Sequence, residues 1–493
     1  MKKLLSLTLV LFTVLSLFSC TGKEITPMPI ATTKAESTTA PTDQLGSEPI
    51  QPEPDVPFYA GYAKINISPD RFPILMFGGT PAKRINDDLF LTVVAVSDGE
   101  NKALFISLDL QSASGTILTR ALNTAEKYGV PRENVLVNAT HNHSGVHSDA
   151  LSTYAGQRWC FKTYKAIEEG IKTALEDLSA TTAEIAKIET PPLNHVRRYY
   201  MKDGTTSGIQ MPDSQVGYDR HESEADRELQ AIRFCREDKK DIVMVNWQAH
   251  AAHAVGFLND AITADFVHYF REGVEEKYDV LFAYYQGACG NINFDSYVHG
   301  GKSSIIAGMT LVDVLGEALE NAEPAKLGKI NTEMFEYTAT VDHSTDKYYD
   351  RAIEARTVFN DYKALYGKEM TNNELYKQFK FYSKYHIYSI INRYNSEKTI
   401  DIPISAISFG DISFASTPYE MFDTNGMQVK DGSPFKMTFM CAYTNGHYGY
   451  VPSTNVYNNG GYEVYTTRFI KGTGDDVAAK LIEMLKAQYT QNN

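Results

Sequence analysis

Hydrophobic residues recur along this chain with two periods, one typical of strands and the other of helices. Short apolar runs rich in β-branched and aromatic residues predict strands at 91–96, 103–108, 135–137 and 242–247. Residues 114–128 lie between the second and third of these strands, have helical spacing and are followed by Gly129. A strand, helix, strand order is typical of an α/β fold, so we expect mixed sheets flanked by helices.

The pattern continues to the end of the chain. It predicts further helices at 159–178 and 475–488, and further strands at 405–409 and 412–415. Residues 345–396 are rich in Tyr and Lys and have helical periodicity with few breakers, which predicts a helical insertion. Such an insertion is either a peripheral helical hairpin or a lid over a binding site.

The first 20 residues have the pattern of a secretory signal peptide. Two lysines precede an apolar run, Leu4 to Phe18, that is too short to span a bilayer comfortably. The sequence Leu-Phe-Ser-Cys then resembles a bacterial lipobox, which makes Cys20 the expected lipidation site; the alternative is an ordinary signal peptide with a chance cysteine. We therefore expect a protein of the cell envelope, outside the cytoplasm and anchored to a membrane by lipid.

Two segments of different composition follow. Residues 21–57 are rich in Thr, Pro and Ser and poor in aromatic residues, so they bury too little apolar surface to offset their chain entropy and form a disordered tether. Residues 58–490 are aromatic-rich and contain no second low-complexity stretch, which indicates one folded unit.

Charge and cysteine content narrow the functional classes. The formal net charge of -14 argues against a nucleic-acid partner, because binding phosphates requires a basic surface. The remaining cysteines show no CxxC spacing, and both two disulfides and four free thiols stay open for Cys160, Cys235, Cys289 and Cys441.

Two groups of histidines follow predicted strands. His141 and His143 are two residues apart, so on an extended backbone both face the same ion or substrate atom; the alternative is a pair of hydrogen-bonded structural histidines. His250 lies just past the strand at 242–247, where a metal ligand is well placed. We expect Asp265 to fix its tautomer and His253 to be a bystander.

Two further polar segments lie near the C-terminal end. Glu420 follows the strand at 412–415 directly. The segment 445–463 is crowded with Tyr and Gly, which is typical of a ligand-facing loop, although an aromatic surface loop is the alternative.

Taken in order, these segments resemble the catalytic domain of the neutral/alkaline ceramidases, zinc amidases that cleave the N-acyl bond of ceramide. The resemblance covers residues 59–462 in patches and opens at Ala60–Pro69, which is similar to the family's G-x-A-x-x-D-I-T/S-P. It implies a zinc-dependent hydrolase whose substrate is a small molecule or a lipid, with residues 58–490 as the catalytic domain.

The family's motifs imply particular ligands and catalytic residues here. The zinc ligands implied are His141 in T-H-x-H-S-G, His250 after N-F/W-x-x-H, Glu420 in P-x-E, and Tyr450 in N-x-Y-x-x-Y, where His447 occupies the first Tyr position. Residues implied near the scissile carbonyl, to orient substrate and stabilise an oxyanion, are His143, Arg197 and Tyr462.

The chain departs from the family at its nucleophile. Ceramidases carry a serine in G-D-V-S-P, and here residues 290–294 read Gly-Asn-Ile-Asn-Phe, with Asn293 in the serine's position. An amide cannot attack a carbonyl, so the nucleophile is a water molecule activated by zinc, or the chemistry has changed. Cys289 is an alternative nucleophile. We also expect no immunoglobulin-like C-terminal domain.

Three functional readings therefore remain open. The first is hydrolysis of an amide or related acyl bond resembling that of ceramide. The second is hydrolysis of a non-sphingoid ester, amide or glycan-derived group, because one fold serves many substrates. The third is a non-catalytic lipoprotein that binds a lipid or a sugar.

Overall fold

The computed structural model describes residues 57–147, 150–207, 217–254, 258–294 and 303–492. The expected signal peptide, the lipidation site Cys20 and nearly all of the expected tether lie outside these residues. Of the described helices, none combines the length and the apolar character that a bilayer crossing requires. The described cysteines Cys160, Cys235, Cys289 and Cys441 form no disulfide with one another, which decides between the two alternatives left open by their spacing.

A nine-stranded mixed sheet forms the centre of the fold, with strand order β16-β14-β13-β8-β1-β5-β6-β7 and β18 paired to β8. Its strands are β1 (Tyr59–Asn66), β5 (Phe90–Ser97), β6 (Lys102–Leu108), β7 (Val135–Ala139), β8 (Ser179–Glu189), β13 (Glu228–Arg236), β14 (Ile242–Trp247), β16 (Leu281–Gln286) and β18 (Glu323–Ala325). Most neighbours are antiparallel, whereas β6/β7 and β14/β16 are parallel.

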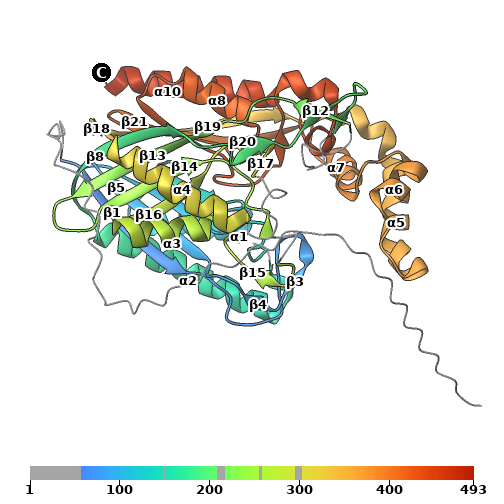
Figure 1. The fold of residues 1–493 in the computed structure, drawn as a ribbon, viewed down its shortest axis with the longest axis horizontal. Coiled ribbons are helices and arrows are strands. Elements are labelled where there is room, and N and C mark those ends of the chain that lie inside the picture. Colours follow the sequence, from blue (N-terminus) through green and yellow to red (C-terminus); the bar gives the residue numbers. More distant parts are fainter. Residues whose placement is uncertain (1–56, 148–149, 208–216, 255–257, 295–302, 493) are drawn as a thin grey trace, which may run out of the picture. The chain divides into compact units, whose positions relative to one another are not determined.

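Both faces of this sheet are buried, which explains why its strands are nearly continuous apolar runs. In β5, Leu91, Val93 and Ala95 face the core beneath the helices α1 to α4, and Val94 and Val96 face a second sheet. These helices cover the first face (Figure 1): α1 (Gly115–Lys127), α2 (Tyr154–Glu176), α3 (Phe266–Tyr278) and α4 (Ser303–Glu320).

The second sheet has four strands in the order β19-β20-β21-β23 and packs on the other face of the large sheet. Its strands are β19 (Ile330–Thr340), β20 (Thr399–Phe409), β21 (Ile412–Ser416) and β23 (Met437–Cys441). On its far side lie α8 (Asp423–Gly432) and α10 (Thr473–Asn492), and α10 packs Leu481 and Leu485 toward the strands (Figure 1). The expected α/β class, with mixed sheets between helices, is thus confirmed.

The two ends of the large sheet approach each other. The backbone N–H of Gln286, at the end of β16, donates to the side chain of Asn138 in β7 over 3.0 Å. The Gln286 side-chain amide then donates to the carbonyl of Thr140 (3.2 Å) and to that of Ala249 (2.6 Å). The loops that follow β7 and β14 therefore meet, although these strands are far apart in sheet order.

Short elements complete the described chain. The remaining strands are β2 (Ile74–Leu75), β3 (Pro81–Ala82), β4 (Arg84–Ile85), β9 (Asn194–Val196), β10 (Tyr199–Met201), β11 (Thr206–Ser207), β12 (Tyr218–His221), β15 (Ala261–Ile262), β17 (Ile292–Phe294), β22 (Glu420–Met421) and β24 (Tyr450–Val451). Between β19 and β20, where a helical insertion is predicted, are α5 (Tyr349–Tyr366), α6 (Asn372–Phe379) and α7 (Lys384–Tyr394); α9 (Tyr462–Thr466) follows β24. Helices α5 to α7 share a small apolar core of their own.

Candidate metal centre

Loops that leave four strands of the two sheets contribute to one polar site. His141 and His143 follow β7, His250 follows β14, Glu420 follows β21, and Tyr450 lies beyond β23. Each of these four strands has a parallel neighbour: β7 pairs with β6, β14 with β16, and β21 with β23. Because the carboxyl ends of parallel strands lie at one edge, chain segments far apart in sequence converge there.

His141 is held in one orientation by its surroundings. The residue is buried, and its backbone has a φ of 58°, which is uncommon for a residue other than glycine. Its ring stacks on Tyr443 with centroids 4.0 Å apart. The Nδ1 atom lies 2.9 Å from the carbonyl oxygen of Gln111. Since a carbonyl only accepts, Nδ1 carries the proton, and the lone pair of Nε2 points into the site.

His250 is oriented in the same way. Its Nδ1 donates to the carbonyl oxygen of Ile292 over 3.0 Å, which leaves Nε2 as an acceptor. Burial, and then the charge of Arg197, lower the pKa of His250 to about 4. The imidazole is therefore neutral near pH 7, which is the form that binds a metal ion.

Glu420 and Tyr450 are brought together by backbone pairing. They face each other in the parallel register of β22 and β24. Gly290 lies against this segment: a Cβ there would stand 2.5 Å from the carbonyl oxygen of Glu420, so only glycine fits the close approach. Burial raises the pKa of Glu420, but the neighbouring His141 lowers it by more. The pKa of Glu420 therefore lies well below its usual value, and the carboxyl is ionised.

His143 completes a group of three histidines. Its Nε2 lies 3.2 Å from Nε2 of His141, and the ligand atoms of His141, His143 and His250 all lie within 4.8 Å of one another. Burial, and then the neighbouring His141 and His250, hold the pKa of His143 well below its usual value. These three residues can hold a metal ion.

The donor atoms in this site fit a cation. The Glu420 Oε2 atom lies 3.4 Å from Nε2 of His141 and 3.6 Å from Nε2 of His250, and it is buried without a hydrogen-bond partner among the described residues. Two imidazole lone pairs thus face a carboxylate oxygen with no proton between them. Acceptors arranged in this way repel one another unless a positive ion lies among them, so the residues fit a metal.

Two solved structures are similar to this chain in fold. The structure of a neutral ceramidase from Pseudomonas aeruginosa aligns with a TM-score of 0.65 over 89% of this chain and 75% of that one, at 15% identity. The chain has a ceramidase-like fold. A structure described as a ceramidase complexed with C2 matches equally, with a TM-score of 0.65 and 15% identity over 89% of this chain and 76% of that one. No protein-family model matches the sequence.

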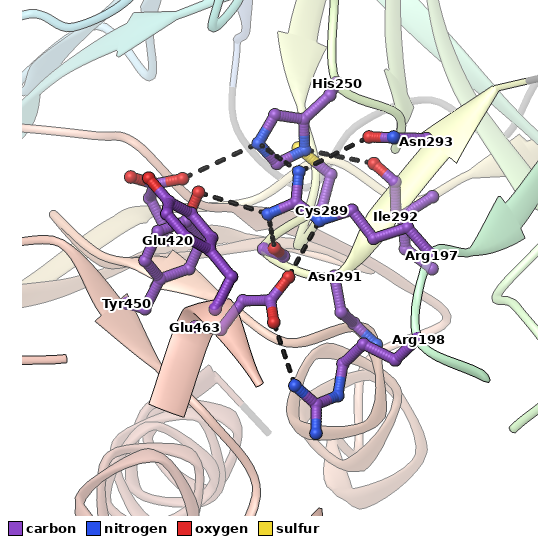
Figure 2. Close-up of polar contacts among 12 residues, drawn as sticks. Arg197, Arg198, His250, Cys289, Asn291, Ile292, Asn293, Glu420, Tyr450 and Glu463 are labelled. Atoms are coloured by element: carbon purple, nitrogen blue, oxygen red, sulfur yellow. Dashed lines mark hydrogen bonds and ion pairs between the residues drawn. The ribbon is translucent and has the colours of Figure 1, made fainter. Parts of the chain in front are cut away.

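Within this ceramidase-like fold, Arg197 lies beside His250 (Figure 2). Its Nη1 lies 3.4 Å from Nε2 of His250 and 3.4 Å from Oδ1 of Asn293, and its Nη2 donates to the Tyr450 hydroxyl over 3.1 Å. The burial of Arg197 lowers its pKa, but the neighbouring Tyr450 and Glu463 raise it more, so the pKa is well above the usual value. Arg197 is a fixed positive charge at the rim of the centre.

Sequence reasoning missed the residue that holds Arg197. Glu463 is fully buried and accepts from Arg197 Nε at 2.8 Å through one oxygen and from Arg198 Nη1 at 2.9 Å through the other (Figure 2). Arg198 also pairs with Glu222 at 2.6 Å. Glu463 directly follows Tyr462 in the sequence, but nothing local marks it as the partner of Arg197 and Arg198.

His447 is a second residue whose role the sequence did not reveal. Its Nε2 lies 3.2 Å from Oε1 of Glu420. A carboxylate only accepts, so His447 donates there and leaves Oε2 of Glu420 to face His141 and His250. In the sequence, residue 447 is distinguished only by a histidine where the family motif has a tyrosine.

The predicted role of Asp265 is wrong. The carbonyl of Ile292, rather than Asp265, holds Nδ1 of His250. Asp265 caps α3 through the backbone N–H of Phe266 at 2.7 Å and accepts from the N–H of Ala254 at 3.0 Å. A backbone carbonyl brought close by β17 carries no signal in the sequence, so periodicity and residue type could not point to it.

Asn293 and Cys289 lie on the same segment but differ in access. Asn293 is in β17, is partly exposed and receives a hydrogen bond from Arg197. Cys289 is fully buried with its Sγ 3.1 Å from the Tyr443 hydroxyl, and burial raises the pKa of its thiol well above the usual value. The Cys289 thiol is therefore protonated and out of reach of a substrate, which argues against it as a nucleophile.

Proposed function

We propose that this chain is a zinc-dependent hydrolase of an amide or related acyl bond, acting outside the cytoplasm and tethered through Cys20. The observation that carries the proposal is the convergence of His141 Nε2, His250 Nε2 and the unpartnered Oε2 of Glu420. The similarity in fold to proteins described as ceramidases supports the same class of chemistry.

The residues that would hold zinc are His141, His250, Glu420 and Tyr450. Two neutral imidazoles, a carboxylate and a phenol are ligands that zinc accepts. When bound, the ion polarises an acyl carbonyl and makes water acidic near neutral pH. His143 is either a further ligand or a group that orients the substrate, since its Nε2 lies 3.2 Å from Nε2 of His141.

The surrounding residues supply positive charge and hydrogen-bond donors. The Arg197 guanidinium, held by Glu463, can bind the carbonyl oxygen and stabilise the negative charge that develops on it. Tyr462 packs edge-on to Tyr450, with ring centroids 5.7 Å apart, and its hydroxyl is a further hydrogen-bond donor. Asn293 presents an amide where the ceramidases have a nucleophilic serine, so this chain orients reactants at that position rather than attacking them.

Metal analysis tests the proposal directly. Purified protein is expected to bind one equivalent of zinc per chain, and His141→Ala is expected to lose both the metal and acyl-bond hydrolysis. His268→Ala, which changes a histidine of α3 outside the centre, is the matched control and should keep both. Wild-type protein without stoichiometric zinc, or a His141→Ala variant with full activity, would contradict the proposal.

A further inference from the structure

A cavity of ≈ 560 Å³ lies next to the candidate centre. It is bounded by β11, by α6, by the two residues that precede α7, and by α9 with the turn that leads into it. Tyr462 connects the two sites, because it lines the cavity and its ring packs on Tyr450.

The described residues that line this cavity are uncharged, and none is aliphatic. They are Tyr, Asn, Ser, Thr and Gly only. A charged ligand would lose its hydration there without gaining a counterion. An alkyl chain would find no Leu, Ile, Val or Met side chain to pack against. The cavity therefore favours a neutral, polar ligand.

Several polar groups in the cavity have unused hydrogen-bonding capacity. The side-chain amides of Asn372 and Asn373, which are exposed, and the hydroxyl of Tyr462 have no hydrogen-bond partner among the described residues and are available to a ligand. Asn459 donates through Nδ2 to the hydroxyl of Tyr200 (3.1 Å) and to Glu222 (2.7 Å), which fixes the amide and leaves its Oδ1 as an acceptor. Donors and acceptors spread around one neutral cavity suit a ligand with several hydroxyl groups.

Aromatic rings form another part of the wall. Tyr382 stacks on Tyr465 with centroids 4.3 Å apart and planes 5° from parallel, and Tyr376 packs against Tyr382 at 5.0 Å. Aromatic faces are electron-rich and attract the partly positive C–H groups on the flat side of a sugar ring. Tyrosine rings combined with amide groups thus suit a pyranose, which carries both C–H groups and hydroxyls.

We propose that this cavity binds an uncharged sugar ring, and that the ring carries the acyl group whose bond is cleaved. The inference rests on the proposed hydrolase function and names its substrate class. For an N-acyl amino sugar, water adds its hydroxyl to the acyl carbon, the C–N bond breaks, and the nitrogen takes the proton. The products are a carboxylic acid and the free amino sugar. An O-acyl sugar reacts in the same way, with the sugar hydroxyl as leaving group.

Binding measured without metal tests the inference separately from catalysis. Chelator-treated full-length protein is titrated with N-acetylated and O-acetylated mono- and disaccharides, and with N-hexanoylsphingosine as the lipid comparison. The variants are the double change Asn372→Ala with Asn373→Ala, and Tyr376→Ala. The matched controls are Asn392→Ala and Tyr366→Ala, which alter exposed residues of α7 and α5 outside the cavity.

At least one acylated sugar is expected to bind, and the cavity variants should weaken it about tenfold while the controls leave it unchanged. Circular dichroism confirms that each variant is folded. The inference is overturned if no acylated sugar saturates the protein, or if the cavity variants weaken the ceramide analogue and not the sugar. Sugar binding that persists while zinc binding and hydrolysis are absent contradicts the proposed function alone.

Discussion

At the scale of single residues, the site depends on proton positions and on paired charges. His141 and His250 each donate a hydrogen bond from Nδ1 to a backbone carbonyl, which directs both Nε2 lone pairs toward Glu420. Next to them, Glu463 holds the two guanidinium groups of Arg197 and Arg198 away from water. The lone pairs beside Glu420 favour the binding of a cation. The pairing with Glu463 fixes the position of the positive charge on Arg197.

Replacing Glu463 should destabilise the fold as well as the site. Glu463→Gln removes the carboxylate between Arg197 and Arg198 and leaves buried positive charge, so we expect a loss of about 3–5 kcal/mol in the free energy of unfolding. Urea denaturation measures this loss. Glu276→Gln, on the exposed side of α3, is the control and should change stability little. An unchanged unfolding midpoint for Glu463→Gln would contradict the importance of the network.

Asn293 offers a second test at this scale. Asn293→Ser places a hydroxyl close to Nη1 of Arg197, at the position that we propose to correspond to the ceramidase serine. We expect the variant to hydrolyse short-chain ceramide faster than the parent, because a hydroxyl can attack a carbonyl and an amide cannot. Release of fatty acid is the measurement, with Asn293→Ala as the control. Efficient cleavage of ceramide by the unchanged chain would show that the serine is dispensable.

At the scale of elements, α6 links the helical insertion to the cavity. Its N-terminus has a capping box: Thr371 accepts from the N–H of Glu374, and Glu374 accepts from the N–H of Thr371 at 2.8 Å. Asn372 and Asn373 follow in the first turn and line the cavity. The cap therefore sets the position of the amides that we assign to sugar binding.

Thr371→Ala should loosen this helix. Loss of an N-cap costs about 1 kcal/mol, so we expect faster hydrogen exchange in the α6 segment and a weaker affinity for acylated sugars. Thr357→Ala, an exposed position in the middle of α5, is the control. Equal exchange in the two variants would contradict the role of the cap.

The same cap predicts a dependence on pH. Hydrogen bonds from the Thr371 N–H and then from Lys368 lower the pKa of Glu374 from 4.5 to about 2. A lowered pKa means that the cap stabilises α6 fully above the unfolded pKa and loses this effect as the pH falls toward the folded pKa. Protection of α6 from exchange should therefore fall between pH 5 and pH 2 in the parent, and fall less in Glu374→Gln.

At the scale of the whole molecule, the packing of the two sheets positions the centre. The apolar layer between them includes Phe105 of the large sheet and Phe414 of the small one, with ring centroids 4.2 Å apart. Because β7 and β14 supply the histidines and β21 leads to Glu420, any shift of one sheet over the other moves the ligands apart. Sheet packing and metal binding are thus linked.

Phe414→Ala should weaken both stability and metal affinity. Removing a buried phenylalanine costs about 3–5 kcal/mol, and the cavity lets β21 shift relative to β7. We expect a lower unfolding midpoint in urea and a zinc affinity reduced in the folded variant, measured by competition with a chelator. Phe161→Ala, at an exposed site of α2, is the control. A destabilised variant with unchanged zinc affinity would show that the two properties are independent.

The sequence by itself determined several of the strands and helices and named the residues proposed for the site. Alternating and helical periods are local properties, so β5, β6, β14 and α1 were predicted within a few residues. The motif around His141 and the order of His250, Glu420 and Tyr450 likewise named residues that the structure gathers at one end of its sheets.

Only the tertiary structure decided how these residues meet. The approach of β16 to β7, the register that pairs Glu420 with Tyr450, and the carbonyl of Ile292 that replaces Asp265 all depend on contacts between distant segments. The same holds for Glu463, whose partners are more than 250 residues away in the chain. Periodicity gives the face of each element, whereas register and closure follow from the free energy of packing the whole chain.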